Sequence, residues 1–576
     1  MHLGYPVSNE ANSSAHCGNG CQSGPCLGPA VVPGPSPSPA LPASTPGSFK
    51  IVGRSGVPAM HAALMPNGRV VFLDKVENYT ELPSKYVAGG TSCGPSCTET
   101  RTGFYSYSSE YDPATNKVVA LSYKTNAFCA GGIFLADGRL VSLGGNLDLP
   151  GIDPTIASGF NAIRYLERGP GNIALNGQDW SEPGNKLASN RWYPSAQNMP
   201  DGTILVASGS LNGENISDPA NNNPTYEILN PDGTTKGVNI PMEILVKAQP
   251  YFMYPFIHLL RDGTIFVFAS KHSEVFDVAK NSTVYQFEDL AGDYRVYPNT
   301  GGSVMLPLSS FNNYEPDIVI CGGGAYNDVQ SPTDASCGRI KPLVKDAQWE
   351  MDAMPEGRGM VEGTLLPDGT VIWLNGANQG SQGFNLARKP TLEALIYDPA
   401  RPHGQRWTTG AESTIPRLYH SVALLLLDGT IMVAGSNPVD QPMAKPTETT
   451  PYVTEFRVEI FTPPYLSSNN TSRRPTDISL SATKFQVGHN YTILFNAPPK
   501  SKEVKVALYY GGFVTHSVHM GQRMVYLDTS NFWPGDKLQT IDIKVPDNKA
   551  VVPPGPYAVY VVVDGIPGIG QFVLVS

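Results

Sequence analysis

The sequence has no long apolar run, no cluster of basic residues and almost no long amphipathic pattern of helical period. The first absence excludes a membrane-spanning helix, which needs about 20 consecutive apolar residues. The second, with a formal net charge of −10, argues against nucleic acid and anionic membranes as partners. The third agrees with an all-β protein.

Glycine and proline, in contrast, are abundant, with 58 and 52 residues in a chain of 576. Such a content is typical of a β protein with many turns. With 41% hydrophobic and 16% charged residues the composition is globular, and the length allows more than one domain.

Cysteine is scarce, and five of the eight cysteines lie between residues 49 and 468. Cys93 and Cys97 bracket a Gly-Pro-Ser turn, and Cys321 and Cys337 bracket a loop. Both pairs are candidate disulfides of an oxidising compartment. Cys129 belongs to neither pair, which leaves two interpretations: a buried inert thiol or a residue with chemistry of its own.

The other three cysteines lie within residues 1–27, and an odd number does not complete a disulfide module. The first residues also lack the charged and apolar regions of a signal peptide. A truncated start would explain both features. Residues 28–48, rich in Pro, Ala and Ser, are expected to form a semi-extended linker.

An internal repeat organises residues 49–468. Its mark is an Asp-Gly or Asn-Gly dipeptide between apolar runs, a strong hairpin signal. A seventh, degenerate copy runs from Gly301 to Gly324. Seven units with a period near the roughly 50 residues of kelch repeats predict a seven-bladed kelch-like β-propeller. The six clear copies are Asn67-Gly68, Asp137-Gly138, Asp201-Gly202, Asp262-Gly263, Asp368-Gly369 and Asp428-Gly429.

Four residues with metal-binding or redox side chains share one position in this repeat. Cys129 and Tyr193 each stand eight residues before the Asp, and Tyr419 and His420 stand nine and eight residues before it. Equal spacing predicts that they converge on the propeller axis. With a second imidazole from His516, this set suits copper(II) better than a structural zinc, which usually has more thiolates.

The sequence pattern of residues 474–576 predicts a second domain. Its short alternating strands and lack of cysteine indicate an immunoglobulin-like β-sandwich. His516 follows a Gly-Gly pair, so it is expected at a loop tip that can reach into the propeller axis.

Other residues near these positions have two interpretations. Tyr254 and Met360 stand eight residues before an Asp, so they either line a substrate pocket or pack the channel. His61, His258 and His519 are out of register and are assigned to packing or hydrogen bonding, not to metal.

Several motifs together resemble the copper-radical oxidases, the family of galactose oxidase and glyoxal oxidase, over nearly all of residues 49–576. They are Asn126-Ala-Phe-Cys129, Arg191-Trp-Tyr193, Asn223-Pro-Thr-Tyr-Glu227, Arg417-Leu-Tyr419-His420-Ser421 and Thr515-His516-Ser517-Val518.

This resemblance implies one copper ion and a protein-derived cofactor. Cys129 and Tyr193 match the thioether-linked pair, with Tyr193 as the equatorial radical ligand. Tyr419 matches the axial ligand and general base, and His420 and His516 match the imidazole ligands. The implied reaction removes two electrons from an alcohol or hydrated aldehyde and reduces O₂ to H₂O₂.

A few residues distinguish between the substrate classes of this family. The stacking Trp of galactose oxidase falls on Leu211, and the contexts of Tyr193 and Glu227 look like the glyoxal oxidase branch, which favours small aldehydes such as glyoxal and methylglyoxal. Trp192 is a candidate shield for the radical or a core residue. The alternatives are an alcohol or sugar oxidase and a non-catalytic glycan-binding propeller.

The resemblance also sets expectations for location and partners. We expect a secreted fungal glycoprotein, monomeric and extracellular, whose H₂O₂ peroxidases can use. Seven Asn-X-Ser/Thr sites permit glycosylation. Residues 1–27 resemble the end of a hevein-type chitin-binding module, so chitin is a partner only if that module is complete.

Overall fold

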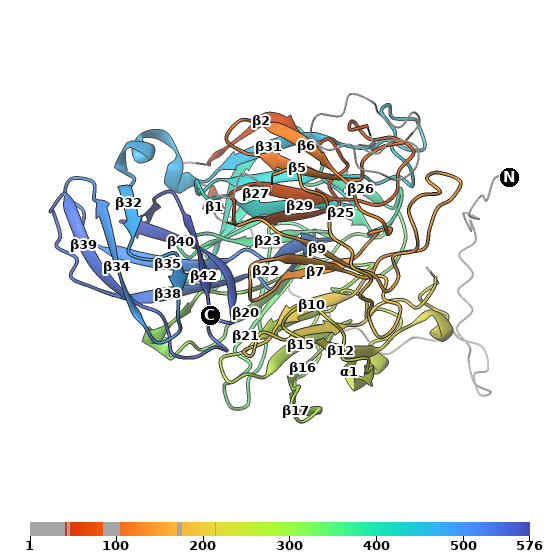
Figure 1. Cartoon of the computed structure of the whole chain (residues 1–576), viewed down its shortest axis with the longest axis horizontal. Coiled ribbons are helices and arrows are strands. Elements are labelled where there is room, and N and C mark those ends of the chain that lie inside the picture. The colour runs from red at the N-terminus through yellow and green to blue at the C-terminus, as the bar shows by residue number, and fades with distance from the viewer. Residues whose placement is uncertain (1–40, 43–45, 84–103, 170–175, 214) are drawn as a thin grey trace.

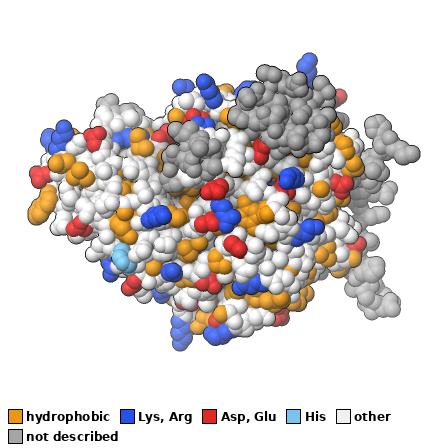
Figure 2. Space-filling model, in the orientation of Figure 1, with side chains coloured by type: hydrophobic (Ala, Val, Ile, Leu, Met, Phe, Trp, Pro, Cys, Tyr) orange, Lys and Arg blue, Asp and Glu red, His pale blue; other side chains and the backbone are white. Residues whose placement is uncertain are grey.

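The computed structural model describes residues 41–42, 46–83, 104–169, 176–213 and 215–576. Seven small antiparallel sheets form a β-propeller, as the repeat predicts, and a C-terminal β unit packs beside it (Figure 1). In the described residues no helix is long and apolar enough to cross a membrane. On the face drawn in Figure 2, acidic and basic side chains are interspersed among the described residues.

The blades follow one another along the chain. Blades one to three comprise β3 (His61–Leu64), β4 (Val70–Leu73), β5 (Ser108–Asp112) and β6 (Lys117–Leu121); β7 (Gly131–Phe134), β8 (Leu140–Leu143) and β9 (Ile163–Leu166); and β10 (Ser195–Asn198), β11 (Ile204–Ala207), β12 (Thr225–Leu229) and β13 (Ile240–Pro241). Blades four and five comprise β14 (Phe256–Leu259), β15 (Ile265–Ala269), β16 (His272–Asp277) and β17 (Ser282–Gln286); and β18 (Gly302–Met305), β20 (Ile318–Cys321), β21 (Ser336–Ile340) and β22 (Glu350–Ala353). Blades six and seven comprise β23 (Glu362–Leu365), β24 (Val371–Leu374), β27 (Glu393–Tyr397) and β28 (Trp407–Glu412); and β29 (Ser421–Leu425), β30 (Ile431–Gly435), β31 (Arg457–Thr462) and β2 (Ser48–Arg54).

Short elements connect or extend the blades. The described helices are α1 (Glu243–Lys247) and the 3₁₀ turns Pro219–Asn221, Ser310–Asn312, Pro464–Leu466 and Ser468–Arg473. Within the propeller segment lie also β1 (Leu41–Pro42), which pairs with β28, and the hairpin β25 (Ala377–Gly380) and β26 (Ala387–Pro390). β19 (Leu308–Ser309) also comes from this segment but pairs with β38 (Arg523–Ser530) of the C-terminal unit. β1 lies within the predicted linker, most of which is outside the described residues.

The Asp-Gly turns join the two inner strands of a blade for a local reason. The carboxylate oxygen of Asp201 accepts hydrogen bonds from Thr203 N at 3.0 Å and from the Thr203 hydroxyl at 2.6 Å. Gly202 between them has a φ of 84°, which glycine adopts without a Cβ clash. Asp262 binds Thr264 in the same way. The repeated dipeptide therefore forms the hairpin turn that the sequence predicts.

The ring is closed by the N-terminal strand. β2 pairs antiparallel with β31, so blade seven contains strands from both ends of the propeller segment. The repeat did not predict this closure, because β2 precedes the first Asn-Gly turn and carries no repeat motif.

The C-terminal unit is the immunoglobulin-like β-sandwich that the sequence predicts, and its strands are hydrogen-bonded in one continuous order. Its strands are β32 (Thr476–Leu480), β33 (Lys484–Phe485), β34 (Asn490–Asn496), β35 (Val504–Tyr510), β38 (Arg523–Ser530), β39 (Leu538–Lys544), β40 (Gly555–Val563), β41 (Ile566–Pro567) and β42 (Gln571–Val575).

A hairpin from this unit enters the propeller. It consists of β36 (Phe513–Thr515) and β37 (Val518–Met520), and β36 pairs with β3 of blade one. Buried apolar side chains of the hairpin and of the blades form one cluster. The two units are therefore joined by a shared core as well as by strand pairing.

One predicted disulfide is present. Cys321 and Cys337 face each other on β20 and β21 and are bonded. Cys93 and Cys97, like the three cysteines of residues 1–27, lie outside the described residues.

Candidate metal centre

One backbone geometry recurs two residues before the first strand of the blades. Cys129, Tyr193, Tyr254 and Met360 occupy this place before β7, β10, β14 and β23, and all have positive φ, between 47° and 66°. In blade seven Tyr419 has this position and the adjoining His420 has a φ of 65°. Because the same left-handed turn precedes the first strand of each of these blades, equal sequence spacing places the side chains at one level on the propeller axis.

Such conformations cost of order 1–3 kcal/mol each for residues other than glycine and persist only where the surroundings hold them. Hydrogen bonds between neighbouring blades do so here. Tyr193 N donates to Cys129 O at 3.0 Å, Tyr254 N to Tyr193 O at 3.0 Å, and Met360 N to Thr300 O at 2.7 Å.

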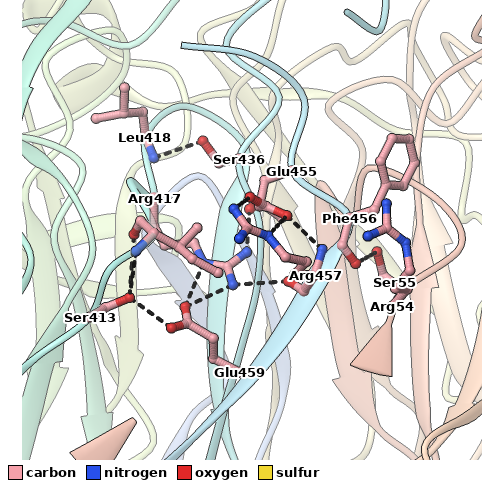
Figure 3. A network of polar contacts seen from close by, with 12 residues as sticks. Arg54, Ser55, Ser413, Arg417, Leu418, Ser436, Glu455, Phe456, Arg457 and Glu459 are labelled. Atoms are coloured by element: carbon pink, nitrogen blue, oxygen red, sulfur yellow. Dashed lines mark hydrogen bonds and ion pairs between the residues drawn. The ribbon is translucent and has the colours of Figure 1, made fainter. Parts of the chain in front are cut away.

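Buried arginines hold these turns from behind. Arg417, two residues before Tyr419, forms an ion pair with Glu459 at 2.9 Å and donates to Gly435 O at 2.7 Å (Figure 3). Ser413 donates to the other carboxylate oxygen of Glu459 at 2.7 Å. Burial lowers the pKa of Arg417, and the Glu459 carboxylate opposes that shift. Arg191, two residues before Tyr193, binds Glu227 on β12 in the same way, at 2.9 Å.

The thiol and two imidazoles meet at the propeller axis. The ligand atoms of Cys129, His420 and His516 all lie within 4.8 Å of one another, and all three residues are buried. Cys129 Sγ is 3.2 Å from His516 Nε2 and 4.0 Å from His420 Nε2. His516 stands at the tip of the β36–β37 hairpin, where it and Ser517 both have positive φ.

The two imidazoles are oriented to offer their Nε2 atoms. His420 Nδ1 lies 3.2 Å from Asn437 O, and His516 Nδ1 lies 2.6 Å from the Thr515 hydroxyl. Burial lowers the pKa of His420 and of His516 well below the usual value, so both rings are neutral. A neutral imidazole whose Nδ1 is engaged in a hydrogen bond is the form that binds metal through Nε2.

Two phenols complete the cluster. The hydroxyl oxygens of Tyr193 and Tyr419 are 3.3 Å apart, and the Tyr419 ring stacks on His420 with centroids 3.7 Å apart. Burial raises the pKa of both phenols well above the usual value. A bound cation is therefore needed to hold either tyrosine as phenolate.

This donor set fits copper. Two neutral imidazole nitrogens and two phenol oxygens converge on a buried point, and nitrogen and oxygen donors of this kind are typical of copper(II). A structural zinc site usually has more thiolates, and Cys129 is the one thiol in this cluster.

Tyr254 and Met360 pack against the site. The Tyr254 hydroxyl donates to Ala130 O at 3.0 Å, and its ring centroid is 5.0 Å from that of His516. Met360 belongs to a buried apolar cluster with Tyr419. Both contacts match the packing interpretation.

Among the described residues, the other three buried histidines are not part of the ligand cluster, although the His61 ring neighbours that of His516, with centroids 6.4 Å apart. His61 Nδ1 is 2.8 Å from Leu73 O, and His258 Nε2 is 2.8 Å from the Ser303 hydroxyl. His519, on β37, faces the buried Glu362, with Nδ1 and Oε1 3.7 Å apart.

Sequence reasoning missed Tyr297. Its ring stacks on Tyr193 with centroids 4.2 Å apart, and the two hydroxyl oxygens are 2.9 Å apart. It precedes the degenerate blade five, which has no Asp-Gly turn to set a register. Leu211 is half-buried elsewhere, where its carbonyl accepts from Asn190.

Comparisons with known proteins agree with this geometry. Residues 60–465, more than half of the chain, match the family described as glyoxal oxidase N-terminus. Residues 474–575 match the family described as galactose oxidase-like, Early set domain. The chain therefore belongs to the glyoxal oxidase and galactose oxidase family of copper-radical oxidases, and it is a copper-radical oxidoreductase.

Relatives include plant and fungal proteins. Aldehyde oxidase GLOX of Vitis pseudoreticulata is 33% identical over 543 residues, which cover 92% of this chain and 97% of the relative. Aldehyde oxidase GLOX1 of Arabidopsis thaliana is 29% identical and covers 92% of this chain and 84% of its own. Galactose oxidase of Gibberella zeae is 24% identical and covers 82% and 65%.

A solved structure shows the same fold. A fungal alcohol oxidase of the AA5 family, in complex with copper, superposes with a TM-score of 0.71 at 21% identity. The match covers 92% of this chain and 100% of that chain.

Proposed function

We propose that this protein is a secreted copper-radical oxidase that converts small aldehydes, as their hydrates, to carboxylic acids and reduces O₂ to H₂O₂. The observation that carries this proposal is the buried meeting of Cys129, Tyr193, Tyr419, His420 and His516 at the propeller axis. A purely structural propeller has no need to hold two neutral imidazoles, two phenols and a thiol in unfavourable backbone conformations at one point.

His420, His516, Tyr193 and Tyr419 would hold the metal. Copper, when bound, accepts one electron and acidifies a hydroxyl as a Lewis acid does. The Tyr419 oxygen takes the proton of the substrate hydroxyl as general base. Tyr193, once oxidised by one electron to its phenoxyl radical, would take the hydrogen atom from the substrate carbon, so that it accepts the second of the two electrons and copper accepts the first.

A thioether between Cys129 Sγ and the Tyr193 ring belongs to this proposal. Tyr193 N donates to Cys129 O, so the two residues are adjacent at the backbone. The cross-link forms by loss of two hydrogens, with O₂ as the oxidant, and it lowers the potential at which the ring is oxidised.

Small substrates are favoured because aromatic rings crowd the site. Tyr297 covers Tyr193, and the Phe384 ring lies 5.7 Å from that of Tyr419 and 6.0 Å from that of His420. The two aldehyde oxidases among the relatives point to the same substrate class. Glyoxal and methylglyoxal have this size and are hydrated in water.

The test is a substrate panel. Copper-loaded protein is assayed for H₂O₂ with glyoxal, methylglyoxal, glycerol, benzyl alcohol and galactose, and the products are identified. We expect the highest kcat/KM with glyoxal or methylglyoxal. A preference for galactose or benzyl alcohol would make it an alcohol or sugar oxidase, and no turnover in copper-replete, cross-linked protein would leave a non-catalytic propeller.

The proposal that the protein is secreted and glycosylated rests on its sequence and on one disulfide. Asn-X-Ser/Thr sites are frequent, and the Cys321–Cys337 disulfide fits an oxidising compartment. Expression of the complete natural reading frame in a fungal host, followed by glycosidase treatment of the culture medium, tests this. We expect extracellular protein whose mass falls on deglycosylation, and purely intracellular protein would contradict the proposal.

A further inference from the structure

Tyr297 is a third phenol at the centre. It lies in the segment between β17 and β18, and its ring is nearly parallel to that of Tyr193, with an interplanar angle of 23° and a centroid distance of 4.2 Å. Its hydroxyl oxygen is 2.9 Å from that of Tyr193 and 3.4 Å from that of Tyr419. Since Tyr193 and Tyr419 are themselves 3.3 Å apart, the three oxygens form a closed triangle.

Tyr297 differs from the other two phenols in exposure. Tyr193 is 4% exposed and Tyr419 is 2% exposed, whereas Tyr297 is only partly buried. It therefore stands between the buried pair and the surrounding water, where it covers one face of the Tyr193 ring.

The position of Tyr297 is fixed by contacts with the ligand hairpin. Gln382 N donates to Pro298 O at 2.8 Å, and Thr300 donates to the Gln382 side-chain oxygen at 2.8 Å. The Gln382 side-chain nitrogen donates to His516 O at 3.2 Å. The segment that carries Tyr297 is thus tied through one buried amide to the residue that closes the metal centre.

Trp192 also contacts Tyr193, with ring centroids 4.6 Å apart and a tilt of 32°. It is 1% exposed, and its indole N–H has no hydrogen-bond partner. Trp192 therefore packs behind the site, and Tyr297 is the ring that both stacks on Tyr193 and offers it a hydrogen bond.

We propose that Tyr297 controls the oxidised form of Tyr193, with its ring as a shield and its hydroxyl as the group that sets the reduction potential. This inference rests on the proposed function, because it requires that Tyr193 be the residue that loses an electron. Tyr297 is a positioning residue in this proposal and takes no part in bond breaking.

The direction of the effect follows from charge. With copper bound and the centre reduced, the Tyr193 oxygen would be a phenolate, which could only accept the hydrogen bond that joins it to the Tyr297 hydroxyl. Oxidation by ferricyanide removes one electron from the phenolate, giving the neutral radical and ferrocyanide, and it weakens that bond. The hydrogen bond therefore favours the reduced form and raises the potential.

Two substitutions separate the hydroxyl from the ring. Tyr297→Phe keeps the stack and removes the hydrogen bond, so the equilibrium with ferricyanide should shift about tenfold toward the oxidised form, the usual effect of one hydrogen bond to a charged group. Tyr297→Leu removes both, so the oxidised form should also decay severalfold faster than in Tyr297→Phe. Both are measured by visible absorption and electron paramagnetic resonance of copper-loaded, cross-linked protein.

Tyr254→Phe is the matched control, because it removes a buried hydroxyl that donates to Ala130 O and not to Tyr193. Its equilibrium with ferricyanide should match that of the wild type. Equal equilibria and decay rates in the wild type and both Tyr297 variants would overturn the inference and leave the proposed function standing. A wild-type protein that binds copper but gives no ferricyanide-dependent radical would overturn the proposed function itself.

Discussion

Individual residues at the centre have separable roles. The Tyr419 ring stacks on His420. The Tyr193 ring contacts those of Trp192 and Tyr297. Only Tyr193 is adjacent through its backbone to Cys129. In the proposed function, this asymmetry supports Tyr193 as the residue that carries the radical and Tyr419 as the general base.

We predict that Tyr419→Phe keeps the thioether and the radical absorption but loses about 10²–10⁴-fold in kcat, the usual contribution of a general base. Tyr193→Phe should lose the radical absorption itself. Steady-state assays and visible spectra of both variants test this. A Tyr419→Phe protein with near-normal kcat would show that another group takes the proton.

Cys129→Ser should abolish the cross-link. Intact mass of copper-matured wild-type protein is expected to be two hydrogens lower than the mass calculated with its disulfides, and the variant should lack this difference. Most turnover should disappear with it. Wild-type protein that is active and still alkylated at Cys129 would exclude the thioether.

The sequence predicts these positions well because the Asp-Gly turns give a register that survives folding. It fails at Tyr297, since blade five lacks the turn from which a register is counted. The sequence also does not show which ring packs on Tyr193. Leu211 has the expected spacing, but it is half-buried and its carbonyl accepts a hydrogen bond from Asn190. Which ring covers a site depends on the path of loops, and loops carry little periodic signal.

Among the elements, the segments that enter the inner strands hold bulky residues in the left-handed backbone region. Backbone hydrogen bonds to the neighbouring blade hold the positive-φ turns at Tyr193, Tyr254 and Met360. In blades three and seven a buried Arg–Glu pair also lies behind the turn. The kelch spacing predicts that the turns exist. The spacing does not predict that buried arginines support these turns, because the sequence does not show which carboxylate an arginine pairs with.

Arg417→Met should destabilise the protein by about 3–5 kcal/mol, because it leaves the Glu459 carboxylate buried without its partner. It should also weaken copper binding, since the turn at Tyr419 and His420 is no longer held. Urea unfolding and copper titration measure the two effects. Arg54→Met is the control: Arg54 and Glu81 form an ion pair with the arginine side chain 54% exposed, and its loss should cost at most about 1 kcal/mol.

At the scale of the whole molecule, the β36–β37 hairpin makes the metal centre depend on both units. Copper bound by His516 and by the blades should stabilise them together, by about 2.7 kcal/mol at a free concentration 100 times Kd. We expect one thermal transition that copper shifts upward in the wild type. His516→Ala should lose that shift, and His519→Ala, which lies outside the ligand cluster, should keep it.

Acid should destabilise the fold through its buried histidines. Burial lowers the pKa of His258 to about 3, so between pH 6.5 and pH 3 the unfolded chain binds a proton there that the folded chain does not. Stability falls as pH falls through this window, by about 2 kcal/mol for this residue at pH 5. In His258→Gln, the loss of unfolding free energy between pH 7 and pH 5 should be smaller by that amount. An equal loss in both proteins would show that His258 is protonated in the fold.

The order in which a ribosome makes this chain gives the hairpin another meaning. Cys129 emerges 387 residues before His516, and Ser55, beside the strand that closes the ring, emerges 401 residues before its partner Phe456. The ring therefore stays open until β31 has been made, and the centre stays incomplete until His516 has followed. A product that terminates before His516 lacks one of the proposed copper ligands, so under the proposed function it would not become a source of peroxide.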